Sequence, residues 1–341
     1  MIKVIRPGML TTVQDSGRLG YQAYGMPVAG VMDSYAYRIA NLLVANSCNA
    51  AVLEMTMLGG TFYFEQDTWV SICGADMQAT LNGGKIQNWS RFFVPSGSEL
   101  AFGYGTEGCR SYLAVYGGIA VPEMLGSRST YTRGGIGGFK GRGLQVGDEL
   151  PIGEGDNPPQ YSIILPSEVV PQYTDTVQLR VILGPQDDLF TPQGIDILFN
   201  GAYQISSEAD RMGYRLEGPK IEHIGKPEII SDALCQGAIQ VPGHGMPIIM
   251  MADRGTTGGY AKIGTVIGPD LAKLAQAKPG DVVRFVQCSD NEAVAALQGV
   301  ADRYGEIAAY IAEGKQTTLD KMRHYKVKID GQIYDVKIVE G

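Results

Sequence analysis

Short runs of apolar and β-branched residues alternate with turn residues over most of the chain. Each run is bounded by Gly, Pro, Asn or Asp, residues that end strands at tight turns. This spacing is typical of β-barrels and sandwiches, so we expect a mainly β fold. The clearest runs lie at residues 2–5, 61–64, 69–73, 91–95, 111–117, 177–183 and 247–252.

Two segments in the body of the chain predict short helices. Asp33 precedes a segment with helical spacing of apolar residues, so it is a candidate N-cap for a helix over 34–44. Asp270 is the corresponding candidate for a helix over 271–277. Helices are therefore expected to be few and short in a chain made mostly of strands.

The clearest helix is predicted at 289–315. Ser289 and Glu292 form a capping box, the pattern that satisfies the free N–H groups at a helix start. We expect the apolar face of this helix to pack on a barrel as a terminal brace, and an interaction helix remains the alternative. The residues of that face are Val294, Leu297, Ala301, Tyr304, Ala308 and Ile311.

The two halves of the chain carry similar turn motifs. Residues 13–21 (VQDSGRLGY) resemble residues 208–214 (EADRMGY), and a Pro-rich polar stretch over 153–171 has the composition of a linker. A duplicated β-barrel explains this arrangement. We therefore predict one barrel domain at 1–160 and a second at 172–288.

Composition and charge narrow the class of protein further. The chain of 341 residues is 44% hydrophobic and 19% charged, below the roughly 25% charged residues of an average soluble domain. This favours burial against a partner or in a homo-oligomer. The net charge of -8 and the lack of any Lys/Arg block argue against a nucleic-acid partner. With no signal-like or membrane-spanning apolar stretch, we expect a cytoplasmic protein without a membrane partner.

Several common chemistries lack their motifs. The sequence has no P-loop and no G-x-S-x-G motif, and the glycine cluster at 134–143 does not fit the dinucleotide fingerprint. His223, His244 and His324 are far apart, so no metal site is expected. The five cysteines form no C-x-x-C pair and are interpreted as reduced thiols.

Polar side chains gather in three glycine-containing segments, at 206–213, 236–245 and 252–260. An adjacent Asp and Arg on a turn can present a carboxylate base and a guanidinium that clamps an anion. The same residues can instead pair with each other or cap turns, and whether the three segments form one pocket stays open at this stage. The candidates are Glu208, Asp210, Arg211 and Met212, then Gln236, Gln240 and His244, then Asp253, Arg254 and Thr256. Other polar residues in turns are Gln14, Asp15, Arg18, Asp33, Glu54 and Asp76.

Long motifs from residue 1 to about 288 closely resemble the KipA family. The family is also called allophanate hydrolase subunit 2 or the biotin-dependent carboxyltransferase family. The motifs are TTVQDSGRLGY (11–21), VAGVMD (28–33), CRSYLAVYGG (109–118), GSRSTY (126–131), GGIGGFKGRGLQVGD (134–148), SSEADRMGYRLEG (206–218) and QVPGHGMPIIMMADRGTTGGY (240–260).

The resemblance implies two tandem cyclophilin-like β-barrel domains and a polypeptide that works in a complex. It implies a C-type subunit of an ATP-dependent 5-oxoprolinase, which opens the lactam of 5-oxo-L-proline (pyroglutamate) to give L-glutamate. The implied partners are a KipI-like protein of the allophanate hydrolase subunit 1 type and a lactam-utilisation subunit of the LamB/YcsF type. Because this chain has no P-loop, ATP would be handled by the complex.

The same resemblance leaves two other functions open. One is a carboxyltransferase component that receives carboxybiotin from another chain, as in urea carboxylase. The other is a KipA-type antagonist of a KipI kinase inhibitor.

Hydrolysis of an unstrained lactam through a phosphorylated tetrahedral or imidate intermediate would need a cationic clamp and a base. Arg211 or Arg254 would be the clamp, and Asp210 or Asp253 the base. The substrate-binding candidates are Glu208, Met212, Gln236, Gln240, His244 and Thr256.

The segment 319–341 alternates polar and apolar residues as a hairpin around Asp330 and Gly331. It resembles the opening strands of a biotinyl carrier domain. No Ala-Met-Lys-Met motif follows, so we expect no biotin on this chain. An edge hairpin that completes a barrel or the sheet of a partner is the alternative.

Overall fold

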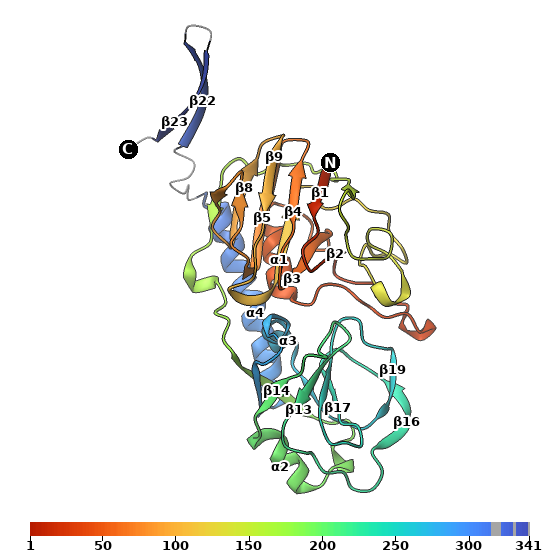
Figure 1. Ribbon diagram of the computed structural model, residues 1–341. Helices are drawn as coiled ribbons and strands as arrows, with labels where there is room; N and C mark the ends of the chain where they lie inside the picture. Colours follow the sequence, from red (N-terminus) through yellow and green to blue (C-terminus); the bar gives the residue numbers. More distant parts are fainter. Residues whose placement is uncertain (315–321, 330–331, 340–341) are drawn as a thin grey trace.

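The computed structural model describes residues 1–314, 322–329 and 332–339, and it confirms a mainly β fold. Two β-rich halves lie one beside the other, and a long C-terminal helix runs along both of them (Figure 1). The domain limits at 160 and 172 stay predictions.

The first half consists of two six-stranded sheets that face each other. The orders are β11-β1-β4-β9-β6-β7 and β12-β8-β5-β10-β3-β2. Side chains from both sheets, such as Phe62, Val70 and Leu113, form one core between them. The strands are β1 (Ile2–Arg6), β2 (Leu10–Gln14), β3 (Val52–Thr56), β4 (Thr61–Phe64), β5 (Thr68–Asp76), β6 (Thr80–Leu81), β7 (Gly84–Lys85), β8 (Ser90–Val94), β9 (Ser98–Ala101), β10 (Glu107–Val115), β11 (Glu149–Leu150) and β12 (Ile163–Ile164).

The second half contains a closed seven-stranded barrel in the order β13-β20-β17-β18-β15-β14-β21. The barrel confirms the β-barrel expected here, and it closes through the parallel pairing of its first and last strands. A separate pair, β16 and β19, lies beside it (Figure 1). The strands are β13 (Thr176–Leu183), β14 (Tyr203–Ile205), β15 (Gly213–Glu217), β16 (Glu228–Ala233), β17 (Ala238–Gln240), β18 (Ile248–Met250), β19 (Thr257–Tyr260), β20 (Lys262–Val266) and β21 (Val282–Gln287).

Helix α1 (Ser34–Leu43) begins where it was predicted. The Asp33 carboxylate accepts hydrogen bonds from the N–H groups of Tyr35 and Ala36, both at 3.0 Å. The buried face of α1 packs on the outer face of the sheet that contains β5 and β10. This packing places Asp33 at the end of the first half that meets the second.

Helix α3 (Gly268–Gln276) starts earlier than predicted, so the assignment of Asp270 as its N-cap is wrong. Ile267 occupies the cap position and Pro269 lies in the first turn, where a missing N–H costs nothing. Asp270 is instead fully buried inside the helix, where its carboxylate pairs with Arg180 and Lys273, each at 2.8 Å. The remaining short helix is α2 (Pro192–Asn200).

Helix α4 (Asp290–Ala312) has the predicted capping box, but most of the predicted contact face is wrong. Val294 and Leu297 are 65% and 56% exposed, whereas Ala293 and Ile307 are buried. Ala293 lets the helix approach the barrel closely, next to Ile267, and Ile307 packs in the cluster beside α1. The apolar residues of this helix form two adjacent stripes. Near the barrel, the stripe with the smaller side chains is buried and the predicted stripe is exposed. Among the described residues, no helix is both long and apolar enough to cross a membrane.

The tail forms the predicted hairpin. Strand β22 (Met322–Ile329) pairs antiparallel with β23 (Gln332–Val339). The turn predicted at Asp330 and Gly331 lies outside the described residues, as do 315–321 and 340–341.

The packing of α4 predicts a strong difference between two apolar truncations. Ile307→Ala should lower the free energy of unfolding by about 2–4 kcal/mol, because it leaves a cavity beside α1. Val294→Ala removes an exposed side chain and should change it by less than about 0.5 kcal/mol. Urea unfolding of both variants measures the difference, and equal losses would contradict the observed face.

Candidate functional site

A turn of the first half reaches into the second half. Residues 28–33 form this turn, and the side chain of Met32 packs in the core of the barrel. The carbonyl of Gly30 accepts a hydrogen bond from Arg211 at 2.5 Å, and the carboxylate of Asp33 accepts one from Gln276 at 2.7 Å. The two halves therefore meet through buried polar contacts as well as apolar ones. We call this region the junction.

Arg211 is the centre of the junction. The turn before β15 carries it, and its guanidinium donates to both oxygens of Asp253, at 3.0 and 2.9 Å. Its Nη1 also donates to Glu54 of β3. All three side chains are buried. One guanidinium therefore joins a carboxylate from each half of the chain.

Arg211, Asp253 and Glu54 form a triad in which two carboxylates share one cation, and this sharing shifts the pKa values of Arg211 and Asp253. Burial opposes charge on Arg211, but Asp253 and Glu54 together raise its pKa above the usual value. Burial raises the pKa of Asp253, and the favourable contact with Arg211 offsets this only in part. Glu54 and Asp210 add negative charge near Asp253 and act in the same direction.

Glu54 connects the triad to a further hydrogen-bond network. Its second oxygen accepts from the backbone N–H of Met32 at 2.8 Å and from the Tyr112 hydroxyl at 2.9 Å. Tyr112 in turn accepts from the N–H of Asp33 at 2.8 Å. Nearly every polar atom of this group is therefore fixed by a partner on another segment.

Arg110 and Gln276 form the other side of the junction. Arg110 of β10 donates to the Tyr214 hydroxyl at 2.7 Å and to the carbonyl of Ala275 at 2.6 Å. The side-chain oxygen of Gln276 accepts from the N–H groups of Cys109 and Arg110, at 3.0 and 2.9 Å. Strand β10 of the first half is thus bound to α3 of the second.

The structure brings together only part of the predicted set. Arg211 and Asp253 are direct partners, and Asp210 lies close enough to influence the pKa of Asp253. The exposed carboxylate of Asp210 accepts from the N–H groups of Met212 and Gly213, at 2.8 and 3.0 Å. Met212 contacts the first half, where its sulfur lies 3.0 Å from Nη1 of Arg133.

Arg254, Thr256 and Gln240 make different contacts. Arg254 is buried and donates to the carbonyls of Leu234 and Met251, both at 3.2 Å. The carbonyl of Thr256 accepts from the N–H of Leu234 at 3.0 Å. Gln240 is buried and donates to the carbonyl of Tyr260 at 3.2 Å. Except for Met251, which follows β18, these contacts involve residues next to or within β16 and β19.

The other predicted residues lie in turns. Glu208 is exposed and pairs with Arg215 at 3.5 Å. His244 is exposed, and its Nδ1 accepts from the N–H of Met246 at 3.0 Å. Gln236 is half-buried in the turn before β17. The catalytic and binding roles of the whole set stay predictions.

Some residues of the junction were not predicted from the sequence as site residues. Glu54 and Arg18 appear in the sequence only as polar residues in turns, and Arg110, Gln276 and Tyr214 were missed. The available signals were a charged residue directly before the apolar run at 111–117 and an amide side chain near the end of the helix predicted at 271–277. Neither pattern identifies its partner in the other half.

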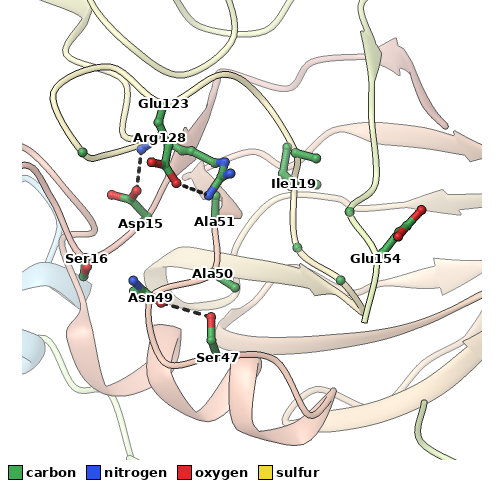
Figure 2. A pocket seen from close by; sticks show the side chains of 15 residues that line it. Asp15, Ser16, Ser47, Asn49, Ala50, Ala51, Ile119, Glu123, Arg128 and Glu154 are labelled. Carbon is green, nitrogen blue, oxygen red and sulfur yellow. Dashed lines mark hydrogen bonds and ion pairs between the residues drawn. The ribbon is translucent and has the colours of Figure 1, made fainter. Parts of the chain in front are cut away.

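A separate hollow of about 280 Å³ lies in the first half (Figure 2). Asp15 lines it, and its carboxylate accepts from the N–H groups of Gly17 and Arg128 and from the hydroxyls of Ser127 and Ser129. The Arg128 guanidinium pairs with Glu123 at 2.8 Å (Figure 2). These charged groups therefore organise the loop, and none of the predicted site residues lines the hollow. In the part of the chain that the structure describes, no group of three or more His, Cys, Asp or Glu is arranged to hold a metal ion.

Comparisons with known proteins agree with this architecture. Residues 24–287 match the family model described as carboxyltransferase domain, subdomain A and B. The chain is 41% identical to the C-type subunit of 5-oxoprolinase from Escherichia coli over 310 residues, which cover 91% of this chain and 98% of that protein. It is 34% identical to urea amidolyase of Saccharomyces cerevisiae over 305 residues, 84% of this chain but 17% of that protein. The crystal structure of K. lactis urea amidolyase superposes with a TM-score of 0.81 at 33% identity, covering 89% of this chain and 20% of that one.

The triad predicts a large stability loss when its cation is removed. Arg211→Met leaves two buried carboxylates unpaired and should lower the free energy of unfolding by about 3–5 kcal/mol. Arg215→Met, which removes a more exposed arginine paired with exposed Glu208, should cost less than about 1 kcal/mol. Denaturant unfolding compares the two variants, and a small loss in Arg211→Met would show that the triad does not hold the junction.

Asp33 predicts a pH dependence of stability. Burial raises its pKa to about 6, against hydrogen bonds from Gln276 and the α1 backbone that favour the charged form. Its contribution to stability is therefore complete below its usual pKa near 4 and is lost as the pH rises through about 6. Relative to Asp33→Asn, the wild-type chain should lose on the order of 2–3 kcal/mol between pH 4 and pH 7.

Asp148 is the control for this measurement, because its contribution to stability should have the opposite pH dependence. The hydrogen bond from Arg142 lowers the pKa of Asp148, so its contribution is present above the usual pKa and lost as the pH falls. Asp148→Asn should therefore cost less at pH 3 than at pH 7. Unfolding curves at each pH test both, and a pH-independent difference for Asp33→Asn would contradict its buried ionisation.

Proposed function

This chain belongs to the carboxyltransferase domain family with subdomains A and B, and on that basis we propose that it is the C-type subunit of an ATP-dependent 5-oxoprolinase. The observation that carries the proposal is the 41% identity to the Escherichia coli protein of that name over 98% of that protein's length. A second relative with the same name, from Haemophilus influenzae, is 34% identical over 93% of its length. The proposed complex hydrolyses 5-oxo-L-proline to L-glutamate.

The proposed partners are a KipI-like subunit and a lactam-utilisation subunit. Hydrolysis of an unstrained lactam needs activation of the carbonyl oxygen, and transfer of a phosphoryl group from ATP to that oxygen would provide it. Water would then add to the activated carbon, and the C–N bond of the ring would break as the nitrogen takes up a proton, leaving an acyl phosphate. A second water would hydrolyse this acyl phosphate to the carboxylate and free phosphate. Because the sequence has no P-loop, we place ATP binding in another subunit. Biotin is not attached to this chain in this proposal.

The contacts at the junction suggest a division of roles among the predicted residues. We propose Asp210 as the base, because its carboxylate is exposed at the edge of the junction next to Asp253. Arg211 is proposed as a positioning residue, since Glu54, Asp253 and Gly30 already take its donors. Arg254 and the polar residues near β16 and β19 are left as a second substrate-binding group.

The second candidate function is carboxyl transfer with carboxybiotin supplied by another chain. The family description and the urea amidolyase relatives favour it. The chain spans 17% of the length of the yeast enzyme, so the activity of that whole protein does not transfer directly. Partner proteins that carry biotin would be expected in this case.

Co-expression with the two proposed partners tests the function. The purified complex should release glutamate from 5-oxo-L-proline only with ATP and only when this chain is present. In that complex, Asp210→Asn should lower kcat by about 100-fold or more, because the amide keeps the turn's hydrogen bonds but cannot accept the proton. Asp196→Asn, the same exchange at an exposed position of α2 outside the predicted set, is the matched control and should lose less than threefold.

The opposite results are equally clear. A stable complex without ATP-dependent glutamate release would contradict the 5-oxoprolinase proposal. Detection of biotin on a co-purified partner with streptavidin would then favour carboxyl transfer. Full activity of Asp210→Asn would remove this residue as the base while leaving the function of the complex intact.

A further inference from the structure

Arg18 is a fully buried arginine with incomplete hydrogen bonding. Its Nη2 donates to the carbonyl of Ser129 at 2.6 Å, whereas Nε and Nη1 have no partner. Among the described residues, Arg18 takes part in no ion pair with a carboxylate. Buried charges are normally paired, and buried N–H groups are normally bonded, so Arg18 is missing an acceptor.

The nearest acids do not supply that acceptor. Burial lowers the pKa of Arg18, and the charges of Asp15 and Asp253 oppose this from a distance. Asp15 is already bound by four donors of its own loop, and Asp253 by Arg211. Arg211 shows the contrast, because each of its three nitrogens has an acceptor. Arg18 therefore offers a cation and free donors beside the junction.

A glycine-rich loop covers Arg18 directly. We call residues 131–143 the glycine loop. A Cβ added at Gly137 would lie 2.5 Å from Nη2 of Arg18, and one at Gly138 would lie 1.8 Å from the hydroxyl of Thr130. Both glycines have positive φ values, of 68° and 53°. Only glycine lets the backbone approach this closely, so the loop forms a fitted cover over the guanidinium.

The glycine loop also reaches the second half. Arg133 near its tip contacts the sulfur of Met212, the residue that follows Arg211. Residues 132–135 of the tip are exposed, whereas Gly138 and Gly141 at the base are buried. The covered Arg18 and the proposed base Asp210 are thus connected through one loop and one turn.

We propose that Arg18 binds the carboxylate of a small acid substrate, and that the glycine loop moves to admit it. This inference rests on the proposed function, in which 5-oxo-L-proline carries one carboxylate next to its lactam. A planar carboxylate fits an arginine fork through two parallel N–H···O bonds. Both forks of a guanidinium include Nη2, and Ser129 uses only one of its two hydrogens, so one fork stays open for the substrate.

The melting temperature Tm distinguishes a ligand-binding role of Arg18 from a structural role. In ligand-free protein, Arg18→Met removes a desolvated and incompletely bonded charge, so the Tm should stay unchanged or rise. A structural arginine would instead lower the Tm on removal. Arg142→Met is the matched control in the same loop, and it should lower the Tm because Arg142 pairs with Asp148 at 2.7 Å.

Binding tests the ligand class. Isothermal titration of the full chain, alone and in the co-expressed complex, uses 5-oxo-L-proline, 2-pyrrolidinone and bicarbonate as probes. Wild type and Arg142→Met should bind 5-oxo-L-proline, and 2-pyrrolidinone, which lacks the carboxylate, should bind at least tenfold more weakly. Arg18→Met should lose this preference. Arg18→Lys, which keeps the charge without the fork, should weaken binding at least tenfold and decides the matter if Arg18→Met does not fold.

The outcomes that overturn the inference differ from those that overturn the proposed function. Equal binding of 5-oxo-L-proline by wild type and both Arg18 variants, or no carboxylate binding at all, overturns the role of Arg18. Binding of bicarbonate but not of 5-oxo-L-proline overturns the substrate assignment and favours carboxyl transfer. A complex that binds 5-oxo-L-proline through Arg18 but releases no glutamate overturns the proposed function alone.

Discussion

The guanidinium of Arg211 is the interaction on which the arrangement of the two halves depends. It connects Glu54, from the middle of strand β3 in the first half, with Asp253, from a turn of the barrel. Each charge in the triad is buried, so in the packed state the three groups depend on one another instead of on water. The network of Asp33, Arg110 and Gln276 around it makes the alignment specific, because Gln276 reaches both Asp33 and the backbone of Arg110 only when the two halves are in register.

The junction also explains why the predicted residues divide into two groups. Asp253 and Arg254 are adjacent in sequence, but they follow a strand in a tight turn, and their side chains point to different surroundings. Asp253 joins the triad, whereas Arg254 binds carbonyls on the side of β16. Asp253 and Arg254 therefore do not belong to one site, although they are adjacent in the sequence. The first half decides which of the two residues becomes part of the junction.

Much of the fold could be predicted from the sequence because its signals are local. The strand pattern, the Asp33 cap and the Ser289 capping box each depend on residues within a few positions of one another. The contact face of α4 was wrong because two apolar stripes fit the same helical period, and only tertiary packing selects between them. The triad could not be completed, since Glu54 lies 157 residues before Arg211 and nothing near it in sequence indicates its partner.

The junction has a consequence for the order in which the chain is made. Glu54 and Asp33 belong to segments that leave the ribosome early, but their partners Arg211 and Gln276 are synthesised much later. Until then, Glu54 and Asp33 lack part of their hydrogen-bond partners, and the apolar side chain of Met32 is uncovered. The nascent first half is therefore an incomplete folding unit, exposed to aggregation during translation, and it reaches its final state only when α3 has emerged.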